Sequence, residues 1–115
     1  METNMKMDVI DEQDGITKLR LIGKLDIEGA LAVDPQFAEI SKSKDKVIVD
    51  LEKVDFLASL GMRTLVSSAK SLMEKGGQLV LVNPQAGVEK AIKSAGLDTI
   101  IPIAPDLKAA IALFR

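Results

Sequence analysis

Two nearly continuous apolar stretches, KVIVDL at 46–51 and QLVLVN at 78–83, constrain the fold of this chain most strongly. Strands that are apolar at almost every position are typical of parallel sheets, whose two faces are both covered by helices. Between these stretches, residues 59–75 carry apolar side chains at helical spacing and end at a pair of glycines. We therefore predict a β-α-β unit within an α/β fold built on a mostly parallel sheet.

The flanking segments extend this pattern. Residues 5–9 and 16–23 read as two alternating strands, joined through an Asp-Gly pair that is a strong hairpin signal. Further on, we expect a helix over 84–96 that is closed by Gly96, a short strand over 99–104, and a terminal helix over 106–115 that is capped by Asp106. The order β-β-α-β-α-β-α-β-α predicts one domain spanning 1–115, with an antiparallel N-terminal edge strand and about four helices.

Two connecting segments are less regular. Residues 27–42 carry a helical but irregular pattern. Within it, Asp34 followed by Pro35 is a good helix N-cap and first-turn proline, so we predict that the main helix after the hairpin begins only there. Phe37 and Ile40 then face the core. Residues 52–58 are expected to form a loop that leads from the strand 46–51 to the next helix.

The composition excludes several kinds of chemistry. Because the chain contains no cysteine and no histidine, disulfides, thiolate catalysis, histidine general bases and zinc ligation by these residues are excluded. A net charge of −2 with mixed signs gives no reason to expect a nucleic-acid partner. Acidic residues near the start and the lack of a membrane-length apolar segment lead us to expect a cytoplasmic protein without membrane contact.

Polar residues follow the strands at the edge where open α/β sheets place their sites. Asp26 follows the second strand, Ser59 the third, and Asn83 and Pro84 the fourth, so Asp26 and Ser59 are expected to be neighbours. Catalysis is not supported, because Ser59 lacks a histidine base and the G-x-S-x-G elbow, and the nucleotide-binding glycine motifs are absent. We predict that the protein is not an enzyme and holds no metal or cofactor.

Ser59 and Asp26 each have an ordinary structural interpretation. Ser59 is a preferred residue type for a helix N-cap, but a helix N-terminus would also stabilise a phosphate attached to it. Such a phosphate adds about −1.5 to −2 charges and, beside Asp26, would make the local potential sharply negative. Asp26 is alternatively a turn residue or the N-cap of a short helix over 27–33.

Four stretches, GKLD at 23–26, VIVDLEKVDFLASLGMRTLV at 47–66, KGGQLVLVN at 75–83 and KSAGLDTIIPI at 93–103, make the chain resemble the STAS domains. The resemblance is to the stand-alone bacterial anti-sigma factor antagonists. It implies a cytoplasmic module that, unphosphorylated, binds an anti-sigma factor serine kinase. The kinase phosphorylates a serine on the antagonist and so ends the binding, and a serine phosphatase reverses the modification.

Anchored on Gly61, the resemblance places the phosphoacceptor at Ser59 and the family's aspartate at Asp26. The chain departs from it at Ala58, where many members have aspartate, and at Leu60, where many have a second serine or a small residue. We predict a non-enzymatic, phosphorylation-controlled interaction switch. The alternative is a STAS module that holds a nucleotide or lipid head group at the same edge, without covalent change.

The helix after Ser59 carries a second feature. Its apolar residues are predicted to form one stripe: Leu65, Val66, Ala69, Leu72 and Met73. The positions opposite this stripe are small and uncharged: Thr64, Ser67, Ser68 and Ser71. They form either an ordinary exposed face or, since interface cores are depleted of charge, a docking surface for the partner next to the switch serine.

Overall fold

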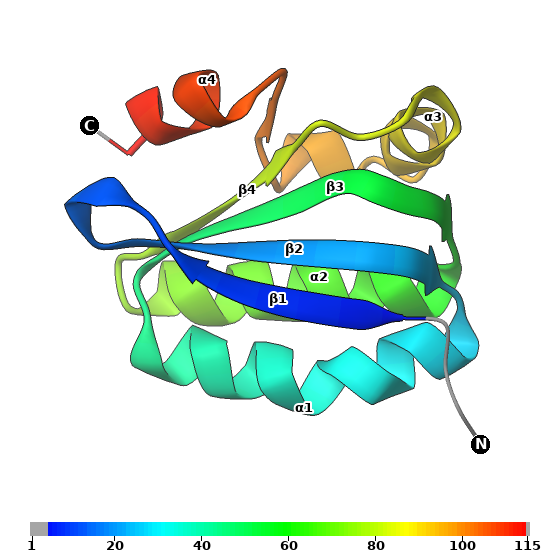
Figure 1. The fold of residues 1–115 in the computed structure, drawn as a ribbon, viewed down its shortest axis with the longest axis horizontal. Helices are drawn as coiled ribbons and strands as arrows, with labels where there is room; N and C mark the ends of the chain where they lie inside the picture. Colours follow the sequence, from blue (N-terminus) through cyan, green and yellow to red (C-terminus); the bar gives the residue numbers. More distant parts are fainter. Residues whose placement is uncertain (1–4, 115) are drawn as a thin grey trace.

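The computed structural model describes residues 5–114, which fold around a mixed five-stranded sheet (Figure 1). The strands are β1 (Lys6–Asp11), β2 (Ile16–Leu25), β3 (Lys46–Leu57), β4 (Gln78–Val82) and β5 (Ile103–Ala104). The α-helices are α1 (Ile27–Ser43), α2 (Ser59–Glu74), α3 (Ala86–Ser94) and α4 (Leu107–Ala112), and the 3-10 helices η1 (Gln13–Gly15) and η2 (Leu97–Thr99) complete the fold. Spatial order follows chain order, with β1 antiparallel to β2 and all other neighbours parallel. The predicted α/β architecture is confirmed.

Both faces of the central strands are covered. Figure 1 shows α1 and α2 along one face of the sheet and α4 on the opposite side. Val49 of β3 and Leu65 of α2 belong to the larger core cluster, whereas Ile48 of β3 packs with Ile111 of α4 in a smaller one. Successive residues of β3 thus enter different cores, which explains why this strand is nearly continuously apolar.

The hairpin forms as its Asp-Gly pair predicts. Asp14 and Gly15 have φ angles of 61° and 73°, the left-handed region that this residue pair tolerates best. The amide of Glu12 donates to the carbonyl oxygen of Ile16 at 2.8 Å and closes the turn.

β3 is longer than predicted. The expected loop 52–58 is mostly strand, because β3 stays paired with β2 as far as Leu57. The register between β2 and β3 shifts between Arg20 and Ile22, where β3 carries an additional residue. Such a bulge breaks the alternation of apolar and polar side chains, so a two-residue period does not continue through the segment.

α1 is also longer than predicted. It begins at Ile27 rather than at Asp34, and Pro35 lies inside it. The predicted role of Asp34 as N-cap is therefore wrong. The bond that Pro35 cannot donate would have gone to the carbonyl of Leu31, and both residues lie on the exposed side of the helix, where water can serve that carbonyl.

The C-terminal segments differ mainly in their boundaries. Gly96 adopts a φ of 78° just after α3, as a helix-ending glycine does. The predicted strand 99–104 is reduced to Ile103–Ala104. Thr99 ends a 3-10 helix, the amide of Ile101 donates back to the carbonyl oxygen of Leu97, and Pro102 has no amide to donate to a neighbouring strand. Asp106 caps α4 as predicted, its Oδ1 accepting from the amide of Ala109 at 2.8 Å.

Candidate functional site

The ends of β2 and β3 lie side by side at the carboxyl edge of the sheet. Leu25 and Leu57, the last residues of the two strands, are paired in register. The amide of Ala58 also donates a hydrogen bond to the carbonyl oxygen of Leu25 at 2.9 Å. The residues that follow, Asp26 and Ser59, are therefore brought to the same edge.

Asn83 does not join them. β4 pairs with β3 only as far as Val82, opposite Asp50, whereas β3 continues to Leu57. The end of β4 thus stops short of the end of β3. Asn83, with a φ of 55°, turns the chain away towards α3.

Asp26 is the N-cap of α1. Its half-buried carboxylate accepts a hydrogen bond from the amide of Gly29 at 2.8 Å, through Oδ1. A side chain at Gly29 would collide with the carbonyl oxygen of Lys24, so glycine lets the first turn fold back tightly against the end of β2. Of the two alternatives for Asp26, the helix cap is the one that forms, and it fixes a carboxylate at this edge.

Ser59 is not the cap of its helix. Ala58 occupies the N-cap position and offers no side-chain acceptor, while Ser59 is the first helical residue. Its side chain is exposed, and within residues 5–114 its hydroxyl makes no hydrogen bond. The interpretation of Ser59 as a helix cap is therefore wrong, and its hydroxyl remains accessible from solvent.

Gly61 holds this helix start against the sheet. A Cβ atom there would lie 2.7 Å from Cγ of Leu25 and 2.9 Å from its carbonyl oxygen, closer than real side chains approach. Any larger residue would push the first turn of α2 away from the end of β2. Gly61 thereby supports the position of Ser59 relative to Asp26.

Accessible apolar side chains lie in the first turns of both helices that begin at this edge, and the predictions from the sequence do not include them. Ile27 and Leu31 of α1 are each 63% exposed, and Leu31 lines the same groove as the half-buried Leu60, the residue after Ser59. We call Ile27, Leu31 and Leu60 the apolar rim. Ile27 and Leu31 lie four residues apart, which places them one turn apart on the same face of a helix. A main helix that begins only at Asp34 excludes both residues, so that prediction does not reveal this face.

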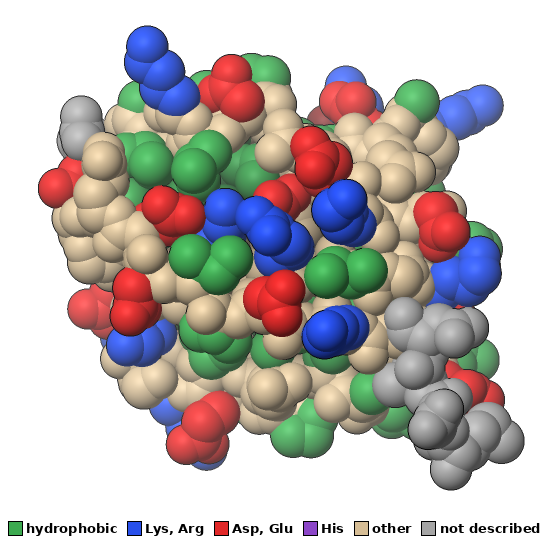
Figure 2. All heavy atoms as spheres, viewed as in Figure 1, with side chains coloured by type: hydrophobic (Ala, Val, Ile, Leu, Met, Phe, Trp, Pro, Cys, Tyr) green, Lys and Arg blue, Asp and Glu red, His purple; other side chains and the backbone are tan. Residues whose placement is uncertain are grey.

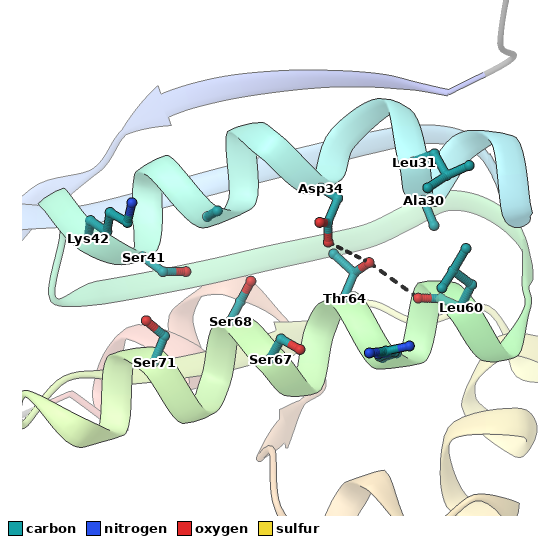
Figure 3. A pocket seen from close by; sticks show the side chains of 12 residues that line it. Ala30, Leu31, Asp34, Ser41, Lys42, Leu60, Thr64, Ser67, Ser68 and Ser71 are labelled. Carbon is teal, nitrogen blue, oxygen red and sulfur yellow. Dashed lines mark hydrogen bonds between the residues drawn. The ribbon is translucent and has the colours of Figure 1, made fainter.

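The predicted polar face of α2 lies against α1 (Figure 3). The hydroxyl of Thr64 shares its one proton between Oδ1 of Asp34, 3.1 Å from Oγ1, and the carbonyl oxygen of Leu60, 3.2 Å from Oγ1. Thr64 and Ser68 are buried, so the expectation of an exposed face is wrong for these two residues. Ser71 is half-buried, and Ser67 alone of the four is exposed.

The apolar stripe of α2 forms with one exception. Leu65, Ala69 and Leu72 are buried against the sheet and Val66 packs beside them, but Met73 is more than half exposed near the end of the helix. The stripe and the polar face therefore contact different neighbours, the sheet and α1.

Charged side chains are mixed over the surface. Along β2, Lys18 pairs with Glu12 at 3.3 Å and Lys24 with Asp55 at 3.6 Å. Figure 2 shows acidic and basic side chains interspersed on the face it presents. In the described part of the chain, no cluster of acidic residues has the arrangement of a metal site, and no helix is long and apolar enough to cross a membrane.

Comparison with known proteins assigns the chain to a family. The family model described as "STAS domain" matches residues 9–110, nearly the whole length. The chain belongs to the STAS domain family. Among its relatives, a Bordetella bronchiseptica protein named as an anti-sigma factor antagonist, BtrV, is 29% identical over 107 residues, covering 92% of each chain.

Solved structures share the fold of this STAS domain. An anti-sigma factor antagonist from Mycobacterium paratuberculosis superposes with a TM-score of 0.85 at 26% identity, covering 95% of this chain and 92% of that one. The antagonist SpoIIAA in its unphosphorylated form gives a TM-score of 0.78 at 19% identity, covering 95% and 96%. The five-stranded sheet and four helices are thus the fold of this family's antagonists.

Proposed function

We propose that this STAS domain is an anti-sigma factor antagonist controlled by phosphorylation of Ser59. Unmodified, it binds an anti-sigma factor that is also a serine kinase. A phosphate on Ser59 ends that binding, and a serine phosphatase removes it. The observation that carries the proposal is the exposed hydroxyl of Ser59 at the first residue of α2, beside the end of β2.

The names of related proteins and the solved forms of one of them support this proposal. BtrV is named as an anti-sigma factor antagonist. SpoIIAA, which shares the fold, has been solved in an unphosphorylated and in a phosphorylated form. Phosphorylation of an antagonist with this fold is therefore a documented state, and Ser59 is the hydroxyl through which we propose that this chain reaches it.

The chemistry belongs to the partners. The kinase transfers the γ-phosphoryl group of ATP to Oγ of Ser59, so that an O–P bond forms, the bond to ADP breaks, and the hydroxyl proton is lost. The phosphatase hydrolyses the phosphoserine to serine and inorganic phosphate. The domain itself contributes an accessible acceptor and needs no cofactor or metal of its own.

The apolar rim is the proposed centre of the contact with the kinase. Exposed apolar side chains beside a polar acceptor suit a surface that is covered in a complex. Of the four residues predicted to contact a partner, Ser67 and Ser71 are accessible for it, whereas Thr64 and Ser68 lie between the helices. The contact surface therefore extends from the rim along the outer side of α2.

A phosphate in this contact is costly to cover. It must lose part of its hydration, and the fixed carboxylate of Asp26 at the same edge adds repulsion. A penalty of about 3 kcal/mol lowers affinity roughly a hundredfold. The helix N-terminus acts in the opposite direction on the free domain and stabilises the phosphate, so the fold persists while the binding is lost.

The test uses the full chain and its kinase, purified from the source cells with the unmodified protein. Incubation with ATP, mapping by mass spectrometry and calorimetry before and after are expected to show phosphate on Ser59 and an affinity at least about a hundredfold lower. Ser59→Ala should bind and resist release, while Ser94→Ala, at an exposed serine of α3, should behave as the wild type. Phosphate found only on other serines, or unchanged affinity after modification of Ser59, would contradict the proposal.

A further inference from the structure

β1 forms one edge of the sheet (Figure 1). Within the part of the chain that the structure describes, it pairs only with β2, and α1 packs mainly against α2 and β2 rather than against β1. The strand at the opposite edge, β5, has only two residues and offers no comparable length. Since an edge strand can pair with a strand of another chain, β1 is the place where the sheet can be extended.

The backbone of β1 points hydrogen-bonding groups away from the sheet. The amide of Glu12 donates to the carbonyl oxygen of Ile16, and bonded residues alternate with non-bonded ones along an antiparallel pair. Every second residue before Glu12 therefore directs its amide and carbonyl towards β2. The residues between them, among them Met7 and Val9, direct theirs outward and find no partner in residues 5–114.

Several features that keep edge strands from pairing are absent from β1. Its register with β2 is continuous along its whole length, so it has no bulge, and its sequence KMDVID contains no proline. The apolar Val9 is 51% exposed. Lys6 and Asp8 form no ion pair within the described residues, because Arg20, which lies opposite Asp8 in β2, pairs with Asp50 instead. These two charges are therefore available to an incoming strand.

The sequence of β1 is complementary to itself in one antiparallel register. Two copies that extend one sheet through β1 are related by a two-fold axis perpendicular to the sheet. With this axis at Met7, Lys6 of each copy lies directly opposite Asp8 of the other. Moving the axis to Asp8 places the two Asp8 carboxylates opposite each other, and moving it to Val9 leaves no opposite charges facing within β1. Opposite charges stabilise a strand pair and like charges destabilise it, so the axis at Met7 is favoured.

We propose that a second copy of this chain docks on β1 as an antiparallel strand, with Met7 of both copies at the two-fold axis. The two Met7 residues exchange hydrogen bonds between amide and carbonyl groups, and Lys6 pairs with Asp8 of the other copy on either side of the axis. Met7 packs against the larger core, so the apolar side chains meet on the face that α1 covers and the charged ones on the opposite face. The proposal is independent of the phosphorylation of Ser59, because it is tested on the unmodified chain without a kinase.

The test is the molar mass of the full chain, measured by sedimentation equilibrium over a range of concentrations. The mass should rise from that of a monomer near about 1 µM towards that of a dimer near about 1 mM, since a contact built on one strand pair is small. By NMR, the amide of Met7 should exchange with solvent more slowly at the higher concentration, because it gains a partner only in the dimer. A monomer at every concentration up to about 1 mM overturns the proposal, as does a dimer in which Met7 is no better protected.

Charge reversals locate the contact. Lys6→Asp, at an exposed position, places like charges opposite each other on both sides of the axis and should weaken the dimer about tenfold or more. Adding Asp8→Lys to this variant restores opposite charges and should return the affinity to within about threefold of the wild type. Lys90→Asp makes the same change of charge at an exposed position of α3 and should leave the dimer unchanged.

The same NMR spectra report whether each variant is folded. Equal affinity of Lys6→Asp and Lys90→Asp contradicts the proposal, because the copies then associate through another surface. A folded double variant that does not recover contradicts the register. If the double variant does not fold, the comparison of Lys6→Asp with Lys90→Asp and the protection of Met7 still decide.

Discussion

α1 and α2 begin in the same way at the same edge of the sheet, but only α1 is closed by a side chain. Each helix has its N-cap directly after a strand and a glycine three residues later: Asp26 with Gly29, and Ala58 with Gly61. At both glycines a side chain would strike a backbone oxygen at the end of β2. The carboxylate of Asp26 accepts from the amide of Gly29, whereas Ala58 has nothing to offer Gly61.

This difference distinguishes a feature that the fold requires from one that it does not. Both helix starts pack closely against β2, so both glycines are needed for the fold. A capping side chain is present at one start only, although replacing a good cap by alanine costs about 1 kcal/mol. The uncapped start is the one that carries the exposed hydroxyl of Ser59. Its first-turn amides are thus available to a group added there, which agrees with the proposed switch.

The largest expected effect comes from replacing the glycines that let both helices pack closely against the end of β2. Gly61→Ala should lower the free energy of unfolding by about 2–3 kcal/mol, because its Cβ overlaps the side chain and carbonyl oxygen of Leu25. Gly29→Ala should cost at least as much, since its Cβ meets a backbone oxygen that cannot rotate away. Urea denaturation measures both.

Gly87→Ala is the matched control. This glycine also lies in the first turn of a helix, α3, but a Cβ there meets nothing within 4 Å. The substitution should be neutral or stabilising by up to about 1 kcal/mol, because alanine favours helix over glycine. Equal stability of all three variants would mean that the two helix starts do not depend on close contact with β2.

The next largest effects come from removing the capping side chain of α1 and adding one to α2. Asp26→Ala should destabilise the protein by about 1 kcal/mol through the loss of the hydrogen bond to Gly29. Ala58→Asp should stabilise it by up to about the same amount, because it supplies the acceptor that α2 lacks. Thermal unfolding at neutral pH measures the stability of both variants. If both lose or both gain stability, a capping carboxylate does not have the same effect at the two helix starts.

The sequence predicted these features unevenly, for physical reasons. Local signals were sufficient where one residue pair decides the structure, as in the Asp-Gly hairpin and the cap of α4 by Asp106. They failed at α1, where Asp34 and Pro35 resemble a helix start, yet the chain is already helical from Ile27. Packing against the sheet and the cap at Asp26 outweigh one missing backbone hydrogen bond.

The candidate site shows a second limit of the same kind. Helical spacing correctly separated the apolar side of α2 from its polar side, but it could not tell which neighbour covers the polar side. Thr64 and Ser68 are buried because α1 is long enough to lie beside them. The groove between the helices therefore could not be predicted without the full length of α1.

The smallest expected effect concerns Ser59 itself. Ser59→Ala should change stability by no more than about 0.5 kcal/mol, because the hydroxyl is exposed and does not cap the helix. Ser59→Asp should stabilise the free domain by about 0.3–1 kcal/mol, since negative charge is favourable in the first turn of a helix, although Asp26 reduces the gain. Ser94→Asp places the same charge at the last residue of α3 and should have the opposite sign. Both changes should shrink in high salt, as interactions of exposed charges do. A loss of stability in Ser59→Asp that also shrinks in high salt would mean that repulsion from Asp26 exceeds the attraction of the helix N-terminus. A phosphate on Ser59 would then weaken the fold as well as the contact with a partner.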